Sequence, residues 1–193
     1  MTVPSTEDPW TRVTSLRGIP ADELISTLQK SVRRGLLENA LLVAREMYES
    51  SAELEEVMWS RLLVISCEDT GTGTFAEPVV LDTLYRMHQR LTRDAGDRWL
   101  FAVHAIRFLV SRTKDRTTDE LALWAAHMLR SGERLPQIPD YALDMHTRRG
   151  QEMGRGIEHF LEEGSKVENE VPGRDTSYRR RLLDIVSAGK WDG

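Results

Sequence analysis

Residues 24–47 read LISTLQKSVRRGLLENALLVAREM and carry the clearest helix signals in the chain. Apolar side chains recur every three or four positions on both sides of Gly35, as they do along one face of an amphipathic helix. Glycine is a poor helix former, so Gly35 favours a break between two such faces. The pattern predicts one helix over residues 21–33, with Pro20 near its first turn, and a second helix over residues 36–48.

Helix signals continue toward the C-terminus. Three capping boxes, in which Ser or Thr precedes Glu by three positions, predict helix starts at Ser50, Thr74 and Thr117. The segment 97–111 is apolar almost all round and is therefore expected to be the central, buried helix. In the sixth helix, which follows Thr117, five apolar side chains are expected to face inward: Leu121, Trp124, Ala125, Met128 and Leu129.

The last third of the chain is more polar. A break over residues 131–139 (SGERLPQIP) contains two prolines and precedes three short predicted helices, over 140–146, 151–163 and 176–188. No segment alternates with a period of two for long enough to form a strand, so the sequence predicts an all-α fold, a compact multi-helix domain. Its expected parts are an irregular leader (1–20), a six-helix body (21–131) and a C-terminal helical extension packed on the body (132–193).

The 193 residues carry a net charge of −5, and 30% of them are charged, which is the balance of an ordinary soluble domain. This acidic balance argues against a strongly basic nucleic-acid binder. The single cysteine, Cys67, cannot form an internal disulfide and is expected to be a buried structural residue. The N-terminus is unlike a signal peptide, and no apolar stretch is long enough to span a bilayer. We therefore expect a soluble, cytoplasmic protein without membrane contacts.

Motifs for the common enzyme classes are incomplete. The glycine cluster of residues 70–74 (TGTGT) lacks the lysine and the preceding strand of a nucleotide-binding loop. Glu53 and Glu56 have the spacing found in helical nucleotide pyrophosphatases, but the second acidic pair of such a site is missing. His104 and His127 lie on apolar helices, where a core or interface histidine is expected. We expect no ATP hydrolysis, no metal and no cofactor, and we assign no catalytic residue.

The densest group of polar, potentially functional side chains lies in residues 141–156. His146, Arg148, Arg149 and Arg155 gather there among glycines, and arginines can bind phosphates or carboxylates through two hydrogen bonds. These four residues are candidates for contact with a phosphate or a partner. The alternative is a solvated loop whose arginines form salt bridges with nearby glutamates.

The same segment holds the strongest candidate for a metal site. Asp140 and Asp144 would share a helix face near His146, but Asp140 directly follows Pro139, as a helix N-cap would. Residues 140–193 contain nine Lys and Arg against eleven Asp and Glu. Any contact with DNA would therefore be local and sensitive to salt.

Two stretches resemble a known family. Residues 24–47, followed by RLLVISCEDTG at 61–71, are similar to the C-terminal region of the MgsA/RarA-type replication-associated recombination ATPases, the AAA+ family that includes the Werner helicase-interacting protein. The family's Lys-Ser-[Val/Ile]-Arg segment corresponds to Lys30–Arg33, and its later acidic segment to Glu68–Gly71. The stretch PDYALDMHTRRGQEMGRG (139–156) looks like a diverged form of a further segment of the family. The resemblance covers about residues 22–165.

This resemblance implies a helical domain like the collar of clamp-loader subunits, through which these ATPases form tetramers at replication forks. It also implies that Lys30, Arg33, Glu68 and Asp69 are family-matched structural positions. Glu68 and Asp69 are expected to hold the turn between the third and fourth helices by accepting hydrogen bonds from backbone N–H groups or arginines. The family's ATPase and lid domains are absent from the sequence, so its activity is not carried over. We expect either a free-standing collar-like protein or a fragment.

Three functions are compatible with these features. The first is a non-catalytic, self-associating helical module linked to DNA replication or repair. Its expected partners are copies of itself (a tetramer by resemblance), a separate AAA+ ATPase and, more weakly, DNA. The second is a small phosphate- or nucleic-acid-directed enzyme or binding protein that uses residues 146–155. The third is an adaptor unrelated to DNA.

Overall fold

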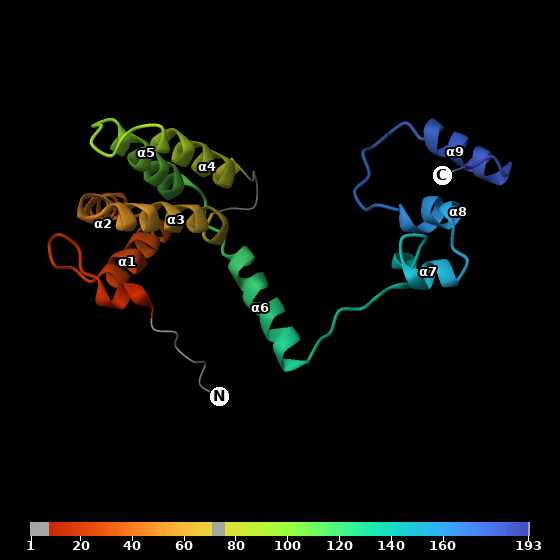
Figure 1. The fold of residues 1–193 in the computed structure, drawn as a ribbon, viewed down its shortest axis with the longest axis horizontal. Coiled ribbons are helices and arrows are strands. Elements are labelled where there is room, and N and C mark those ends of the chain that lie inside the picture. The colour runs from red at the N-terminus through yellow and green to blue at the C-terminus, as the bar shows by residue number, and fades with distance from the viewer. Residues whose placement is uncertain (1–7, 71–75, 193) are drawn as a thin grey trace. The chain divides into compact units, whose positions relative to one another are not determined.

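The computed structural model describes residues 8–70 and 76–192, and every regular element within these ranges is helical (Figure 1). The predicted all-α fold is therefore confirmed. The six longer helices of the N-terminal part are α1 (Ala21–Arg33), α2 (Leu37–Ser50), α3 (Ala52–Glu68), α4 (Ala76–Gln89), α5 (Arg98–Ser111) and α6 (Thr117–Ser131), preceded by one 3-10 turn, η1 (Pro9–Arg12).

The chain divides into two compact units, Met1–Arg130 and Ser131–Gly193. The boundary expected from the sequence, after residue 131, differs by one residue. That the second unit packs on the first stays a prediction. In the described ranges no helix is long and apolar enough to cross a lipid bilayer.

Helices α1 to α5 share one hydrophobic core. Helices α3 and α5 each contact the other four helices of this group, so both are central. Each of the five helices contributes at least one fully buried apolar side chain, for example Leu28, Met47, Trp59, Leu81 and Ile106. The expected burial of 97–111 holds for one face only, because Leu100 on α5 is exposed.

The start of α3 differs from the prediction by one residue. Ser51, with an extended backbone, is the N-cap and accepts a hydrogen bond from the backbone N–H of Leu54 at 3.1 Å. Ser50 is still the last residue of α2, and its hydroxyl donates to the carbonyl of Glu46. The expectation of a cap at Ser50 is therefore wrong. The capping box expected at Thr74 lies outside the described residues.

The described part of the leader is ordered, although it is mostly irregular. Thr14 and Pro20 form an isolated β-bridge that closes a loop, and Gly18 turns the loop with a φ of 76°. Arg17 at the tip forms ion pairs with Glu46 and Glu49 of α2. The loop is thus fixed against α2 by charges rather than by a regular element of its own.

Cys67 is exposed, so the expectation of a buried cysteine is wrong. On α3 the buried positions include Leu62 and Ile65, and Cys67 lies about 200° around the helix from Ile65. It therefore lies on the outer face, beside the exposed Val64. The histidines expected in a core or interface, His104 and His127, are exposed as well.

Helix α6 contradicts the expected inward-facing stripe. None of its residues is buried, and Leu121, Leu123, Trp124 and Leu129 are between 47% and 63% exposed. The chain leaves α5 through Arg112, whose backbone is extended, and α6 then runs away from the other helices (Figure 1). Among the residues that the structure describes, α6 belongs to none of the closely packed helix pairs.

The second unit consists of short elements: η2 (Asp140–Ala142), α7 (Arg148–Glu152), α8 (Ile157–His159), the π-helical turn η3 (Phe160–Gly164) and α9 (Ser177–Ser187). The helix expected over 140–146 is a single 3-10 turn. The helix expected over 151–163 is interrupted at Gly154, which has a φ of 72°. Leu143 and Leu161 are the buried apolar residues of the described part of this unit.

Candidate functional site

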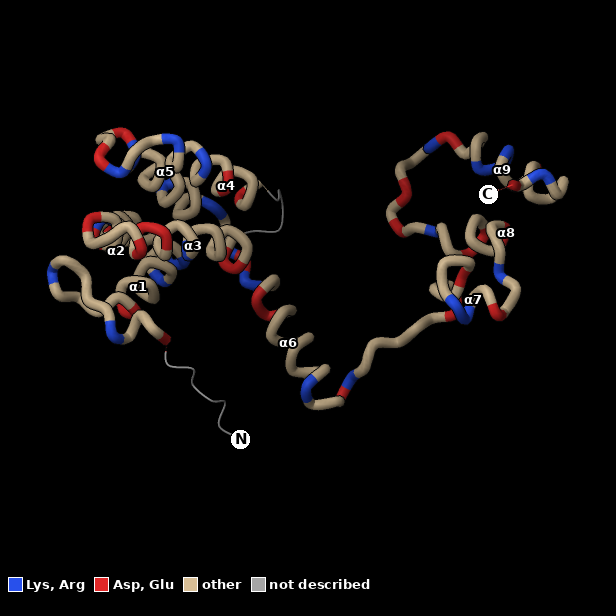
Figure 2. The backbone as a smooth tube through the Cα atoms, viewed as in Figure 1, with Lys and Arg blue, Asp and Glu red and all other residues tan. Residues whose placement is uncertain are grey.

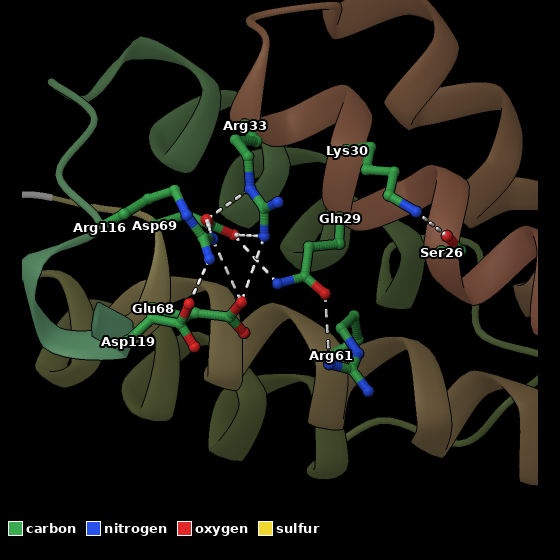
Figure 3. Close-up of polar contacts among 9 residues, drawn as sticks. All are labelled: Ser26, Gln29, Lys30, Arg33, Arg61, Glu68, Asp69, Arg116 and Asp119. Carbon is green, nitrogen blue, oxygen red and sulfur yellow. Dashed lines mark hydrogen bonds and ion pairs between the residues drawn. The ribbon is translucent and has the colours of Figure 1, made fainter. Parts of the chain in front are cut away.

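Asp69 is the centre of an ion-pair cluster at the C-terminal end of α3 (Figure 3). Its side chain is fully buried. One carboxylate oxygen accepts hydrogen bonds from Nε of Arg33 at 2.6 Å and from Nη1 of Arg116 at 2.7 Å. The other accepts from Nε2 of Gln29 at 3.1 Å. One carboxylate therefore joins α1, the end of α3 and the residue that precedes α6.

The position of Asp69 explains why it needs two arginines. It is the C-cap of α3, where the helix dipole disfavours a negative charge. Burial by itself raises the pKa of Asp69, but the hydrogen bonds from Arg33, Gln29 and Arg116 outweigh burial and lower the pKa overall. The carboxylate is therefore charged in the folded protein, and its charge is compensated by partners from other helices.

Glu68 and Asp119 extend this cluster. Glu68 accepts hydrogen bonds from Arg33 at 3.2 Å and from Arg116 at 3.3 Å. Arg116 also pairs with Asp119 in the first turn of α6. The hydrogen bond to Asp69 is the largest of the contributions that raise the pKa of Arg116. The first turn of α6 is thus tied to the end of α3.

The backbone makes a second connection at the same place. The N–H of Asp115 donates to the carbonyl of Asp69 at 3.2 Å, and Thr70 and Lys114 form an isolated β-bridge. The ammonium group of Lys114 donates to carbonyls at the end of α5, including those of Leu109 and Arg112. Burial lowers the pKa of Lys114. The segment between α5 and α6 is therefore bound to the end of α3 through Asp69 and Thr70, and to the end of α5 through Lys114.

Of the four family-matched residues, the structure brings three together. Arg33, Glu68 and Asp69 belong to the cluster, with arginines as the donors to both carboxylates. Lys30 lies apart from them, and its ammonium group donates to Ser26 one turn earlier on α1. Arg61 is the first residue of the second stretch that resembles the family, and it donates to Gln29 at the edge of the cluster (Figure 3).

A second buried ionic group was missed by the sequence analysis. Glu55, near the start of α3, is almost fully buried and contacts His88 at 2.5 Å. It accepts hydrogen bonds from Arg98 at 2.8 Å and Arg93 at 3.0 Å. Burial raises the pKa of Glu55, but the hydrogen bonds from His88 and Arg98 and the charge of Arg98 lower it overall. The contact ties α3 to the end of α4 and the first residue of α5.

The acidic pair Glu53 and Glu56 flanks this buried glutamate. Glu56 accepts a hydrogen bond from the hydroxyl of Tyr85 at 2.6 Å, which is the main reason that the pKa of Tyr85 is raised to about 12. Neither residue contributes to the contacts of Glu55. The available signal for Glu55 was a charged residue inside the apolar stripe of α3, beside Leu54 and Met58.

The four candidates of the second unit have different surroundings. Arg155 is held within the chain, because its guanidinium makes two 2.7 Å hydrogen bonds with the carboxylate of Asp140 and further bonds with the carbonyls of Asp140 and Leu143. Arg148 is 87% exposed and lies 3.5 Å from Glu152. Arg149 is exposed. Contact of these arginines with a phosphate or a partner stays a prediction.

His146 contacts Asp144 and the ring of Phe160, with 5.0 Å between the ring centroids. The hydrogen bond from the backbone N–H of His146 is the first reason that the pKa of Asp144 is lowered. Gly150 packs so closely on the backbone of Asp144 that a Cβ atom there would lie 1.9 Å from its carbonyl oxygen. Within the described residues no three His, Cys, Asp or Glu side chains are arranged to hold a metal ion.

Comparison with known proteins adds no family to this picture, because no family model matches the chain and no curated protein matches it. The arginine and carboxylate clusters at the two ends of α3 connect helices, and the cluster at Asp69 sets where α6 begins. Helix α6, which begins at this cluster, has no buried residue.

Proposed function

We propose that this chain is a non-catalytic helical module that self-associates, and that α6 supplies its contact surface. The observation that carries the proposal is the exposure of large apolar side chains along α6, among them Leu121 and Leu129. Single exposed apolar residues are common on protein surfaces, whereas contiguous groups of them mark interaction sites. Helix α6 carries such a group within residues 121–129.

The ion-pair cluster supports this role. Arg116 and Asp119 attach the first turn of α6 to Asp69 and Glu68, so the direction of the helix is set before any partner binds. A surface that is ordered in advance loses less conformational entropy on association than a flexible segment does. This role needs no enzyme site, and we propose no catalytic residue.

The resemblance to the MgsA/RarA-type ATPases supports a role in replication or repair, with a collar-like domain that forms tetramers. In this proposal the module docks a separately encoded AAA+ ATPase, and any contact with DNA is weak. Two fluorescence anisotropy titrations test this part, one of the labelled module with an ATPase of that family and one of a labelled forked DNA with the module. Binding of the module to the ATPase is the expected result. Absence of binding to both would remove the link to replication and leave self-association standing.

Static light scattering tests self-association itself. The mass of the wild type is expected to rise with concentration to at least twice the 22.1 kDa of one chain. Leu129→Glu on α6 should shift this transition to higher concentration. The matched control is Leu42→Glu, because Leu42 is 70% exposed on α2, outside α6, and its substitution should leave the transition unchanged. A wild-type mass of one chain up to about 100 µM would contradict the proposal.

A second candidate function rests on the exposed guanidinium groups of Arg148 and Arg149. Arginines in water can bind phosphate groups, and this function predicts weak, salt-dependent binding of a nucleotide or nucleic acid. Titration with inorganic phosphate and with a labelled oligonucleotide checks it. If Arg148→Ala combined with Arg149→Ala changes neither titration, this second function fails.

A further inference from the structure

Residues 135–139 read Leu-Pro-Gln-Ile-Pro and lie between α6 and η2. Proline fixes its own φ at about −65° and restricts the residue before it to extended conformations. Every residue of the segment except Gln137 is restricted in one of these two ways. Pro139 has a φ of −71° and a ψ of 157°, close to the values of a polyproline II helix. The sequence therefore favours this extended, left-handed helix throughout the segment.

The segment is open to other molecules. Within the described part of the chain, none of residues 135–138 donates or accepts a hydrogen bond. A polyproline II helix likewise has no internal hydrogen bonds. Leu135 and Ile138 are each 65% exposed, Pro136 is exposed and Pro139 is half-buried. The apolar side chains and the backbone carbonyl groups of residues 135–138 are therefore accessible to a second molecule.

The two prolines and the two large apolar residues share one side of such a helix. With three residues per turn, Pro136 aligns with Pro139, and Leu135 aligns with Ile138 on the adjacent edge. A rise of about 3.1 Å per residue places the two apolar–proline pairs about 9 Å apart. Gln137 lies on the third edge, away from both pairs. The segment therefore presents one ridge made of two similar apolar–proline pairs.

This ridge is more than a rigid spacer needs. Proline alone makes a linker stiff and extended, whatever side chains stand beside it. Here a large apolar side chain precedes each proline and is left in water. Figure 2 shows that the chain carries no charged residue between Arg134 and Asp140, so no charge interrupts the ridge. The apolar side chains, rather than the stiffness, are the feature that points to a partner.

We propose that residues 135–139 are a docking segment for a protein domain with an aromatic-lined groove that binds polyproline II helices. The groove would hold one apolar–proline pair in each of two pockets about 9 Å apart. A Trp or Tyr side chain of the groove can donate a hydrogen bond to a free backbone carbonyl of the segment. Because proline has already restricted the backbone, little conformational entropy is lost on binding. This contact goes beyond the proposed function and does not involve α6.

Nuclear magnetic resonance with a labelled partner domain tests the proposal. The probes are isotope-labelled SH3 domains that bind PxxP peptides, chosen to cover both directions of peptide binding and titrated with the full chain. At least one probe should bind saturably, with its largest shifts at the aromatic residues of its groove. Pro136→Ala combined with Pro139→Ala should weaken this binding at least about tenfold, because both pocket anchors are lost.

Pro172→Ala is the matched control. Pro172 is also an exposed proline of the second unit, but it lies outside the segment, so its substitution should leave binding unchanged. Saturable binding by none of the probes, or equal binding by the wild type and the double variant, would overturn the inference and make residues 135–139 a spacer only. A monomeric wild type that binds a probe through these prolines would remove the proposed self-association and leave this inference standing.

Discussion

Helices α5 and α6 follow one another in the chain, have nearly the same length and are both rich in apolar residues, yet they have opposite surroundings. Helix α5 buries Ala102, Ala105, Ile106 and Leu109 against its neighbours, whereas α6 buries no residue. The composition of a helix therefore does not decide whether its apolar side chains enter the core. The connections at its ends, and the space left by the other helices, do.

At or directly before the start of each helix, an arginine pairs with a buried carboxylate at one end of α3. Arg98, the first residue of α5, pairs with Glu55 near the start of α3. Arg116, directly before α6, pairs with Asp69 at the end of α3. Because Glu55 and Asp69 lie at opposite ends of α3, α5 starts at one end and lies against the core, whereas α6 starts at the other end and leaves it.

The largest effect is expected from Glu55→Ala. It leaves Arg98 and His88 without their carboxylate partner in a buried position, and removal of one partner from such a group costs about 3 to 5 kcal/mol of unfolding free energy. Urea unfolding measures this loss. The control is Glu120→Ala on exposed α6, which should change the free energy of unfolding by less than about 0.5 kcal/mol. Equal effects of the two substitutions would contradict the comparison.

A core substitution in α5 and its counterpart in α6 come next. Ile106→Ala removes a fully buried side chain and should destabilise the fold by about 2 to 4 kcal/mol. Leu129→Ala, measured at a concentration where the chain is monomeric, should cost less than about 0.5 kcal/mol beyond helix propensity. If Leu129→Ala were as destabilising as Ile106→Ala, α6 would be part of the core of a single chain.

Asp69→Asn is expected to have an intermediate effect with a local signature. The amide keeps the shape of the side chain but loses the charge that Arg33 and Arg116 neutralise, at a cost of about 1 to 3 kcal/mol. Amide hydrogen exchange should become faster at the start of α6 and at the end of α1, and change little in α4. Uniformly faster exchange through the whole body would show that Asp69 stabilises the core as a whole rather than this junction.

The smallest effect concerns pH. The pKa values of Glu55 and Asp69 are lowered in the folded protein from ordinary values of 4.5 and 3.8. Their stabilisation is therefore fully present above these ordinary values and is lost as pH falls through the lowered folded values. The unfolding free energy should therefore not vary with pH near neutrality through these two groups, and it should decrease in acid. The decrease should be shallower in Asp69→Asn, and an equally steep decrease in that variant would rule out a contribution from Asp69.

The bounds of the helices could be predicted from the sequence better than the contacts between them. Ala21–Arg33 has the predicted bounds because its apolar period and Pro20 are local signals. The cap at Ser51 rather than Ser50 depends on one backbone dihedral, which adjacent serines do not reveal. Arg33 is a donor of the expected kind to Asp69, whereas no sequence pattern singled out Arg116 as the second donor.

The two main failures of prediction have one physical cause. Glu55 was not recognised as a core residue because a carboxylate is buried only with partners, and its partner Arg98 lies on another helix. Helix α6 was expected to face inward because its apolar stripe resembles that of a core helix. An apolar stripe that meets its own chain and one that meets another molecule have the same period, so the sequence alone does not separate them.

We propose α6 as the surface through which this chain associates with its copies. Amide hydrogen exchange, followed at several protein concentrations, tests it directly. If α6 is this surface, exchange in residues 117–131 should slow as concentration rises through the self-association transition, while exchange in α1 to α5 should stay constant. Exchange in 117–131 that does not change with concentration, or protection that appears on another helix instead, would contradict it.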